Sequence, residues 1–225
     1  MIRLRVSTLE HFRKVVCTEY ESEADLVERI RRGQWAPDAA DTPWYMLAGT
    51  AWHRALACEP PDDAVESTEE VMARYGDYLF SPDDIYAGIA EFGMGSREIT
   101  WHRDWVVDGI TVRLEGTADH VVGRVVSDAK TKFSDVDPSD YEESLQWRAY
   151  LLIHDADVFR YVLFSFKDPA ADGFLKLRKD GIYTFNMWRY PDLERDVLEW
   201  LNRFVGWAIV RGLLPNLSSD RKRTA

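Results

Sequence analysis

The sequence predicts an α+β protein in which helices flank a mixed β-sheet containing a three-strand meander. Between residues 97 and 131, apolar and polar residues alternate with the period of two that strands show. Segments with the helical spacing of apolar residues lie on both sides of that stretch. The chain has 225 residues, of which 46% are hydrophobic, so it can bury one core, and we expect a single domain over residues 1–225.

Two helices are expected before the meander. Ser7 is followed three residues later by Glu10, which is the spacing of a capping box and predicts a helix that begins here. A second helix should run from about Thr42 to Cys58.

An acidic helical insertion is expected over about residues 59–95. Glu59–Glu91 contains ten acidic residues and a single basic one, and its pattern predicts a helix from Ser67 to Phe80. The insertion is either a solvated surface element or a lid or partner-docking face, and the sequence leaves both interpretations open.

The meander should consist of short strands joined by tight turns. Asp108-Gly109 and Gly123-Arg124 have the composition of two-residue hairpin turns, and Gly116 marks an expected break. The expected strand segments are 98–102, 110–114, 118–122 and 125–130.

A helix, a strand, a hairpin and a last helix are expected after the meander. Pro138 suits a first helical turn, so a helix should run from about Pro138 to His154. The other expected elements are a strand over Phe159–Phe166, a hairpin turn at Asp180-Gly181, a helix over Asp192–Arg211 and a basic tail over 218–225.

Composition excludes several classes of protein. The 28 Lys and Arg against 39 Asp and Glu give a net charge of −11, so coating of nucleic acid through bulk charge is excluded, although a local basic groove is not. Cys17 and Cys58 are too few for a disulfide scaffold. The chain has no run of about 18 apolar residues and no apolar leader, so we expect a cytoplasmic protein of a bacterial or phage-infected cell, without membrane association.

The turn at Gly123-Arg124 sets the pairing of the strands that it joins. If it is a two-residue loop, Asp119 lies directly opposite Asp128, and opposed like charges destabilise a sheet. Lys130, on the same face as Asp128, offsets only one carboxylate. A Mg²⁺ or Mn²⁺ ion between the two carboxylates would offset both, since these ions prefer oxygen ligands.

The structural alternative is a salt-bridged strand edge, which is the common meaning of an Asp-x-Lys sequence. Residues 125–130 are apolar enough to be buried on part of both faces, which favours a functional site. Gly49 and His53 lie one turn apart on one helix face, as do Gln146 and Tyr150. A lone histidine is usually structural, and either spacing alone means little.

Taken in order, these residues resemble the PD-(D/E)xK nuclease superfamily, in its RecB-like branch, which includes the CRISPR-associated exonucleases and phage-encoded proteins. The resemblance spans residues 5–165. It is carried by Gly49-x-x-x-His53, Gly116-x-x-Asp119, Asp128-x-Lys130-Thr131 and Gln146-x-x-x-Tyr150. It implies a restriction-endonuclease-like core.

The resemblance also implies a role for each residue. As metal ligands it implies His53, Asp119, Asp128 and the backbone carbonyl of Ala129. As catalytic residues it implies Asp119, Asp128, Lys130, Gln146 and Tyr150, with Lys130 orienting the attacking water. Gln146 and Tyr150 would also brace the site and approach the scissile phosphate, and so bind substrate.

The chain departs from the family pattern at two points. Asp128 stands where Glu is more widespread, which the motif allows. The four-cysteine cluster of the CRISPR-associated members is absent because the chain has only two cysteines. We therefore expect Mg²⁺ or Mn²⁺ as the cofactor and no iron–sulfur cluster.

The expected function is a metal-dependent deoxyribonuclease, an exonuclease or single-strand nuclease in DNA recombination, DNA repair or phage DNA processing. The alternatives are a structure- or site-specific endonuclease of the same fold and a catalytically weak DNA-binding subunit that acts with a recombination partner protein. The oligomeric state stays open.

Substrate DNA, as ends or single strands, would be held by basic residues near the motifs. The candidates are Lys132, Arg148, Lys176, Arg178, Lys179 and the tail, which is alternatively a solubilising end. Trp147 and Trp188 either stack on bases or pack in the core.

Overall fold

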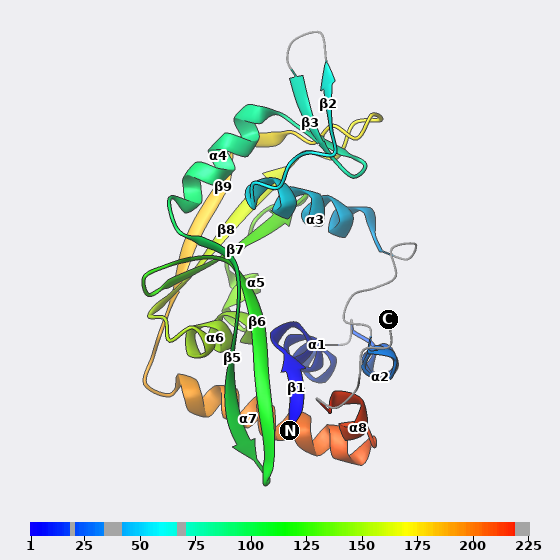
Figure 1. The fold of residues 1–225 in the computed structure, drawn as a ribbon, viewed down its shortest axis with the longest axis vertical. Coiled ribbons are helices and arrows are strands. Elements are labelled where there is room, and N and C mark those ends of the chain that lie inside the picture. Colours follow the sequence, from blue (N-terminus) through cyan, green and yellow to red (C-terminus); the bar gives the residue numbers. More distant parts are fainter. Residues whose placement is uncertain (19–20, 34–41, 67–70, 219–225) are drawn as a thin grey trace.

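The computed structural model describes residues 1–18, 21–33, 42–66 and 71–218. Its main sheet is built from β1 (Ile2–Arg5), β5 (Ser96–Val107), β6 (Ile110–Val122), β7 (Val125–Lys132), β8 (Val158–Phe166) and β9 (Leu177–Trp188). The strand order is β1-β6-β7-β8-β9, with β5 also paired to β6 (Figure 1). β1 runs parallel to β6 and β7 parallel to β8, whereas the other pairs are antiparallel. The predicted α+β class with a mixed sheet and a β5-β6-β7 meander is confirmed.

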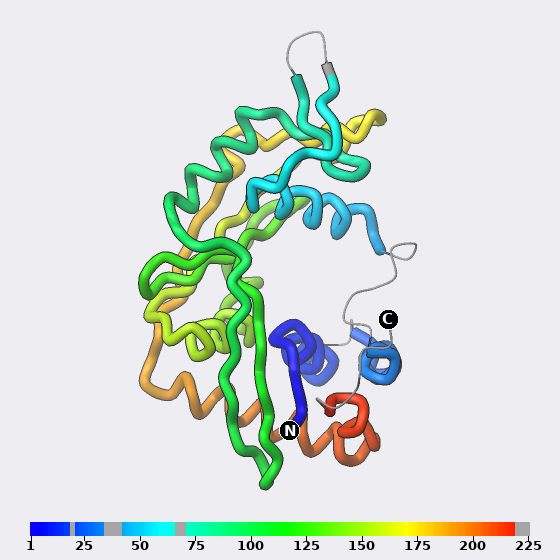
Figure 2. The backbone as a smooth tube through the Cα atoms, viewed as in Figure 1, coloured from blue at the N-terminus to red at the C-terminus, as the bar shows by residue number. Residues whose placement is uncertain are grey.

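Helices cover both faces of this sheet. They are α1 (Val6–Cys17), α2 (Glu23–Arg32), α3 (Trp44–Leu56), α4 (Pro82–Phe92), α5 (Ser139–Glu142), α6 (Leu145–Ile153), α7 (Leu193–Val210) and α8 (Leu214–Leu217). Phe159 and Tyr161 of β8 belong to an apolar cluster with α1, α6 and α7, whereas Val162 and Phe164 belong to one with α3 and α4. Because side chains of a strand alternate between faces, the sheet separates these two clusters. Figure 2 shows the same division, with α3 and α4 at one end of the view and α7 at the other. No helix in the described ranges has the length and apolar character needed to cross a membrane.

The acidic segment forms a small sheet and one helix. The predicted helix from Ser67 to Phe80 is wrong: within its described part, β3 (Val71–Tyr75) and β4 (Tyr78–Phe80) pair antiparallel, and β2 (Asp63–Glu66) pairs with β3. The two-residue turn between Tyr75 and Tyr78 holds Gly76 at a φ of +60°, which glycine adopts readily. The helix of this segment is α4, which begins at Pro82.

The predicted helix boundaries at residues 42–58 and 192–211 agree with α3 and α7 within two residues. The capping box at Ser7 is wrong, because α1 begins directly after β1, at Val6. Glu10 accepts a hydrogen bond from the backbone N–H of Leu145 instead, at 2.7 Å. The helix expected over 138–154 is divided into α5 and α6, since Ser144 caps a new helix by accepting from the N–H of Gln146 at 3.1 Å.

Both meander turns are confirmed as two-residue turns, since Val107 pairs with Ile110 and Val122 with Val125. The break expected at Gly116 is absent, and β6 runs continuously through it. The late hairpin turn is also wrong: Asp180-Gly181 lies in an irregular part of β9, which stays paired with β8 on both sides of it. The predicted strand over 159–166 corresponds to β8. The tail is outside the described residues beyond Ser218.

The glycines of two helices give a matched test of the packing between α4 and α3. A Cβ on Gly88 would lie 2.7 Å from Leu56 Cδ2 and 2.8 Å from Trp52 Cζ2, whereas a Cβ on Gly206 in α7 would meet nothing within 4 Å. Both alanine variants gain helix propensity of about 1 kcal/mol, so their difference isolates the overpacking. We expect Gly88→Ala to unfold with a free energy about 1–3 kcal/mol below that of Gly206→Ala in urea titrations. Equal stabilities would contradict this packing.

Candidate functional site

The β6–β7 ladder ends one residue pair before the two predicted carboxylates. Its last pair joins His120 and Ser127, in the register that the two-residue turn predicts. Asp119 and Asp128 would form the next pair, but Asp119 Oδ2 instead accepts a hydrogen bond from the backbone N–H of Ala129 at 2.6 Å. The predicted direct opposition of the two aspartates is not formed, because the Asp119 side chain takes the place of a main-chain partner for β7.

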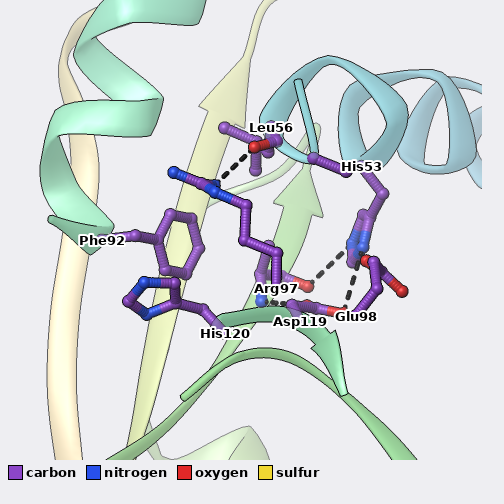
Figure 3. Close-up of a pocket in the computed structure, with 9 residues that line it drawn as sticks. His53, Leu56, Phe92, Arg97, Glu98, Asp119 and His120 are labelled. Atoms are coloured by element: carbon purple, nitrogen blue, oxygen red, sulfur yellow. Dashed lines mark hydrogen bonds and ion pairs between the residues drawn. The ribbon is translucent and has the colours of Figure 1, made fainter. Parts of the chain in front are cut away.

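Helix α3 brings His53 to the same point. His53 Nδ1 lies 3.4 Å from Asp119 Oδ1, and Nε2 donates to the carbonyl oxygen of Ala129 at 3.0 Å (Figure 3). Gly49, one turn earlier, allows this approach, since a Cβ there would lie 2.9 Å from Thr131 Oγ1 on β7. The structure therefore brings together three of the four groups predicted as metal ligands.

Glu98 of β5 is a further member of the site that the sequence analysis missed. His53, Glu98 and Asp119 each offer one ligand atom, and these atoms lie within 4.8 Å of one another. The β5–β6 pairs on either side of Glu98 place it across from Asp119, and both side chains point into the pocket in Figure 3. The Glu98 backbone has a φ of +51°, a region that residues other than glycine seldom adopt. Only the strand register could have identified this carboxylate from the sequence.

Asp128 lies beside this group rather than in it. Its side chain is buried, with the residue only 5% exposed, and both of its oxygens are contacted. Oδ2 lies 2.5 Å from Lys130 Nζ, and Oδ1 accepts from Gln146 Nε2 at 2.8 Å. The helix that follows the strand thus positions the carboxylate, and the carboxylate positions the ammonium group of Lys130.

The charges of the site depend on one another. Burial acts to lower the pKa of His53, but the adjacent Asp119 carboxylate outweighs it and raises that pKa. Burial acts to raise the pKa of Asp119, yet the charges of His53 and Lys130 hold it below its ordinary value. Burial also acts to lower the pKa of Lys130, which Asp128 and Asp119 raise instead. Asp119 therefore stays ionised at neutral pH, as a carboxylate that binds a metal must be.

The donor set fits a divalent cation. Asp119 and Glu98 supply carboxylate oxygens, Ala129 a carbonyl oxygen and His53 one imidazole nitrogen. Burial, followed by the charge of Asp119, raises the pKa of Glu98, which is the behaviour of a carboxylate placed near a second one without enough positive charge. Mostly hard oxygen donors with one nitrogen suit Mg²⁺ or Mn²⁺ better than a soft metal.

Two of the residues predicted to contact substrate, Tyr150 and Lys132, bind other groups of the protein instead. The hydroxyl of Tyr150, a buried residue, donates to the carbonyl oxygen of Thr117 at 2.7 Å, two residues before Asp119. This geometry fits the bracing part of its predicted role rather than the phosphate contact. Gly116 makes room for the ring, since a Cβ there would lie 3.0 Å from it. Lys132 pairs with Asp140 at 3.2 Å.

The remaining predicted contacts lie away from the cluster or in the core. Arg148 donates to the carbonyl oxygen of Ser144 and lies over the Trp147 ring, in a separate pocket with Arg13. Trp147 is buried in the core, so stacking of this ring on a base is excluded, whereas Trp188 is 63% exposed. The tail residues 221–223 are outside the described part of the chain.

Removing the Glu98 carboxylate tests whether it belongs to the metal site. We expect Glu98→Gln to weaken Mn²⁺ binding at least about tenfold in calorimetric titrations, because losing even indirect support of a metal site has that effect. Glu199→Gln, at an exposed position on α7, is the control. Unchanged Mn²⁺ affinity in a folded Glu98→Gln protein would remove Glu98 from the ligand set.

Comparisons with known proteins address the fold. No protein-family model matches the sequence, and no curated protein matches it significantly. Among solved structures, an alkaline exonuclease from Laribacter hongkongensis is similar at 13% identity and a TM-score of 0.52, over 93% of this chain and 89% of that one. The protein SSO0001 is similar at 16% identity and a TM-score of 0.50, over 92% of this chain and 76% of that one. A phage-related exonuclease from Haemophilus somnus 129PT has 14% identity and a TM-score of 0.48, over 93% and 96%. The chain thus shares the fold of the Laribacter alkaline exonuclease.

Proposed function

We propose that this chain is a metal-dependent nuclease that hydrolyses phosphodiester bonds of DNA. The observation that carries the proposal is the convergence of His53, Glu98 and Asp119 within 4.8 Å, next to the Asp128–Lys130 pair. A buried carboxylate paired with a partly exposed ammonium group beside a cluster of metal donors is costly for stability and is typical of a catalytic site. The fold shared with an alkaline exonuclease supports the same assignment.

The ion would be held by the carboxylates of Asp119 and Glu98, the carbonyl oxygen of Ala129 and the imidazole of His53. When bound, Mg²⁺ or Mn²⁺ acidifies a water molecule and neutralises charge on the phosphate. The hydrogen bond from the N–H of Ala129 to Asp119 keeps these two residues in place. His53 Nε2, 3.0 Å from the carbonyl oxygen of Ala129, would give up its proton and its hydrogen bond to that oxygen on binding the ion.

Lys130 would act next to the ion. Its pKa is raised by Asp128 and Asp119, despite burial, so Nζ stays protonated and can donate to the attacking water or to a phosphate oxygen. Its side chain is 31% exposed and lines the groove that leads to the site. Asp128 orients the ammonium group and Gln146 orients Asp128, so we place Gln146 as a positioning residue, as the resemblance to the RecB-like branch implies.

The finer assignment is to an exonuclease or single-strand nuclease in DNA recombination, repair or phage DNA processing. Incubation with end-labelled linear, nicked circular and single-stranded DNA tests it, each with Mg²⁺, Mn²⁺ or EDTA. Metal-dependent release of mononucleotides from ends is the expected result. Linearised circles would indicate a structure- or site-specific endonuclease instead. Binding without cleavage under every condition would overturn the enzyme assignment.

A further inference from the structure

A groove leads along α3 to the candidate metal site. Its cavity volume is about 580 Å³, which is within the range of ligand-binding clefts. One face of α3 forms its wall, and the end of β7 contributes Lys130 and Thr131. The groove is continuous with the site because His53, Glu98 and Ala129 belong to its lining.

The two ends of the groove differ in chemistry. At the far end from the metal donors, α3 presents Tyr45 and Met46, which are 50% and 46% exposed. The carboxylates of the lining lie at the other end, where Glu98 belongs to the donor cluster with His53 and Glu59 follows the C-terminal end of α3. Of the two cations among the described lining residues, Arg54 is paired with Glu59 and Asp62, and Lys130 is paired with Asp128 next to the metal donors. The described residues at the far end are therefore apolar and include no cation that could bind a phosphate.

The Tyr45 ring has a rigid support. The adjacent Trp44 ring lies 6.1 Å from it, edge to face, and is itself packed on Phe133 at 4.6 Å between ring centroids. The carbonyl oxygen of Trp44 accepts a hydrogen bond from the Tyr78 hydroxyl at 2.8 Å, which fixes the first turn of α3. A half-exposed aromatic ring held in this way suits a flat apolar partner, because little side-chain entropy is lost when the partner binds.

We propose that Tyr45 and Met46 contact the bases of the DNA strand that is cut, with Tyr45 as a stacking platform for an unpaired base. The inference rests on the proposed nuclease function, since the occupant of the groove is the strand whose phosphate lies at the metal site. Tyr45 precedes His53 by eight residues, or about 12 Å along the helix, which corresponds to about four stacked nucleotides. An apolar wall this close to the metal donors, and without a cation, meets bases rather than phosphates.

Binding of a fluorescein-labelled single-stranded oligonucleotide, measured by anisotropy in EDTA so that no cleavage occurs, tests the contact. We expect Tyr45→Ala to weaken binding about tenfold, Met46→Ala to weaken it less, and Tyr45→Phe to restore it, since stacking needs the ring and not the hydroxyl. Tyr86→Ala, at an exposed position on α4 outside the groove, is the control and should bind normally. Thermal melting shows whether each variant is folded. We expect the variants to fold, because the side chains of Tyr45 and Met46 are about half exposed and contribute little to the core.

Abasic substitution identifies the partner of the ring. A series of oligonucleotides carries one abasic residue each, at successive positions. At one position, the abasic residue should weaken binding by the natural protein about as much as Tyr45→Ala weakens binding to the intact strand. Tyr45→Ala should then be insensitive to that abasic residue. The proposal would be overturned if Tyr45→Ala bound the intact oligonucleotide as tightly as the natural protein does. It would also be overturned if each abasic residue weakened binding by Tyr45→Ala as much as it weakens binding by the natural protein.

The cleavage assay separates this proposal from the enzyme assignment. If the natural protein cleaves DNA and Tyr45→Ala binds and cleaves equally well, the stacking contact is wrong and the nuclease function stands. If oligonucleotide binding depends on Tyr45 but no metal supports cleavage, the contact stands and the nuclease function is wrong.

Discussion

Lys130→Ala is expected to abolish DNA cleavage while most of the Mn²⁺ affinity remains. The ammonium group lies at the edge of the donor cluster and is not one of the donors, so its loss removes the donor to water or phosphate and leaves His53, Glu98 and Asp119 in place. Removing one preorganised charge of this kind lowers the rate by at least about a hundredfold. Cleavage of end-labelled DNA and calorimetric titration with Mn²⁺ measure the two quantities separately.

The same substitution leaves the buried Asp128 without its cation, which lowers stability. Because burial already raises the pKa of Asp128, the carboxyl group can take up a proton and limit this cost. Lys130→Met keeps the apolar stem, and melting curves show whether either variant is folded. Lys14→Ala, exposed on α1, is the control. A folded Lys130→Met protein that cleaves at the natural rate would remove Lys130 from the mechanism.

Asp119→Asn is expected to lose both Mn²⁺ binding and cleavage with little change in stability. The amide oxygen of Asn can still accept a hydrogen bond from the N–H of Ala129, so the contact between β6 and β7 is preserved while the negative charge of residue 119 is lost. We expect Mn²⁺ affinity to fall by at least about a hundredfold, a larger effect than at Glu98, because Asp119 also contacts His53. Calorimetric titration and chemical denaturation measure the two effects.

Asp119→Ala separates the electrostatic role from the structural one. It also leaves the N–H of Ala129 without its acceptor, which costs about 1–3 kcal/mol of stability if the group stays buried. The free energy of unfolding should therefore fall for Asp119→Ala and not for Asp119→Asn. Asp168→Asn, at an exposed position, is the control. Undiminished Mn²⁺ binding in Asp119→Asn would exclude Asp119 as a ligand.

Local chemistry predicts much of this fold from the sequence. The turns at Asp108-Gly109 and Gly123-Arg124 need residues that tolerate a positive φ, and their composition identified both. Helices α3 and α7 follow from a strong helical spacing of apolar residues. The capping box at Ser7 fails because Ile2–Arg5 joins the sheet beside β6, and a four-residue strand gives too short an alternation to be recognised.

The candidate site is predictable only as far as the register is. Asp119, Asp128 and Lys130 lie on strands whose turn could be recognised, so their proximity could be inferred. Glu98 could have been found in the same way, because the two-residue turn at Asp108-Gly109 places it opposite Asp119, but the break expected at Gly116 interrupted that register. Asp128 is separated from the donor group by its hydrogen bond with Gln146 and by the Asp119 side chain, which accepts from the N–H of Ala129 in place of a backbone carbonyl. The alternation of apolar and polar residues gives no information about either contact.

The hydrogen bond between Asp119 and the backbone of Ala129 has a consequence for ion selectivity. The carboxylate that would face the ion also holds the residue whose carbonyl would face it, so these two oxygens cannot spread apart independently. When the separation of two ligand oxygens is fixed, a site discriminates between cations by their radius. Ca²⁺ takes longer metal–oxygen distances than Mg²⁺, so it would require these oxygens to lie further apart. The end of the β6–β7 pairing, at Asp119 and Ala129, would thus favour small divalent cations over large ones.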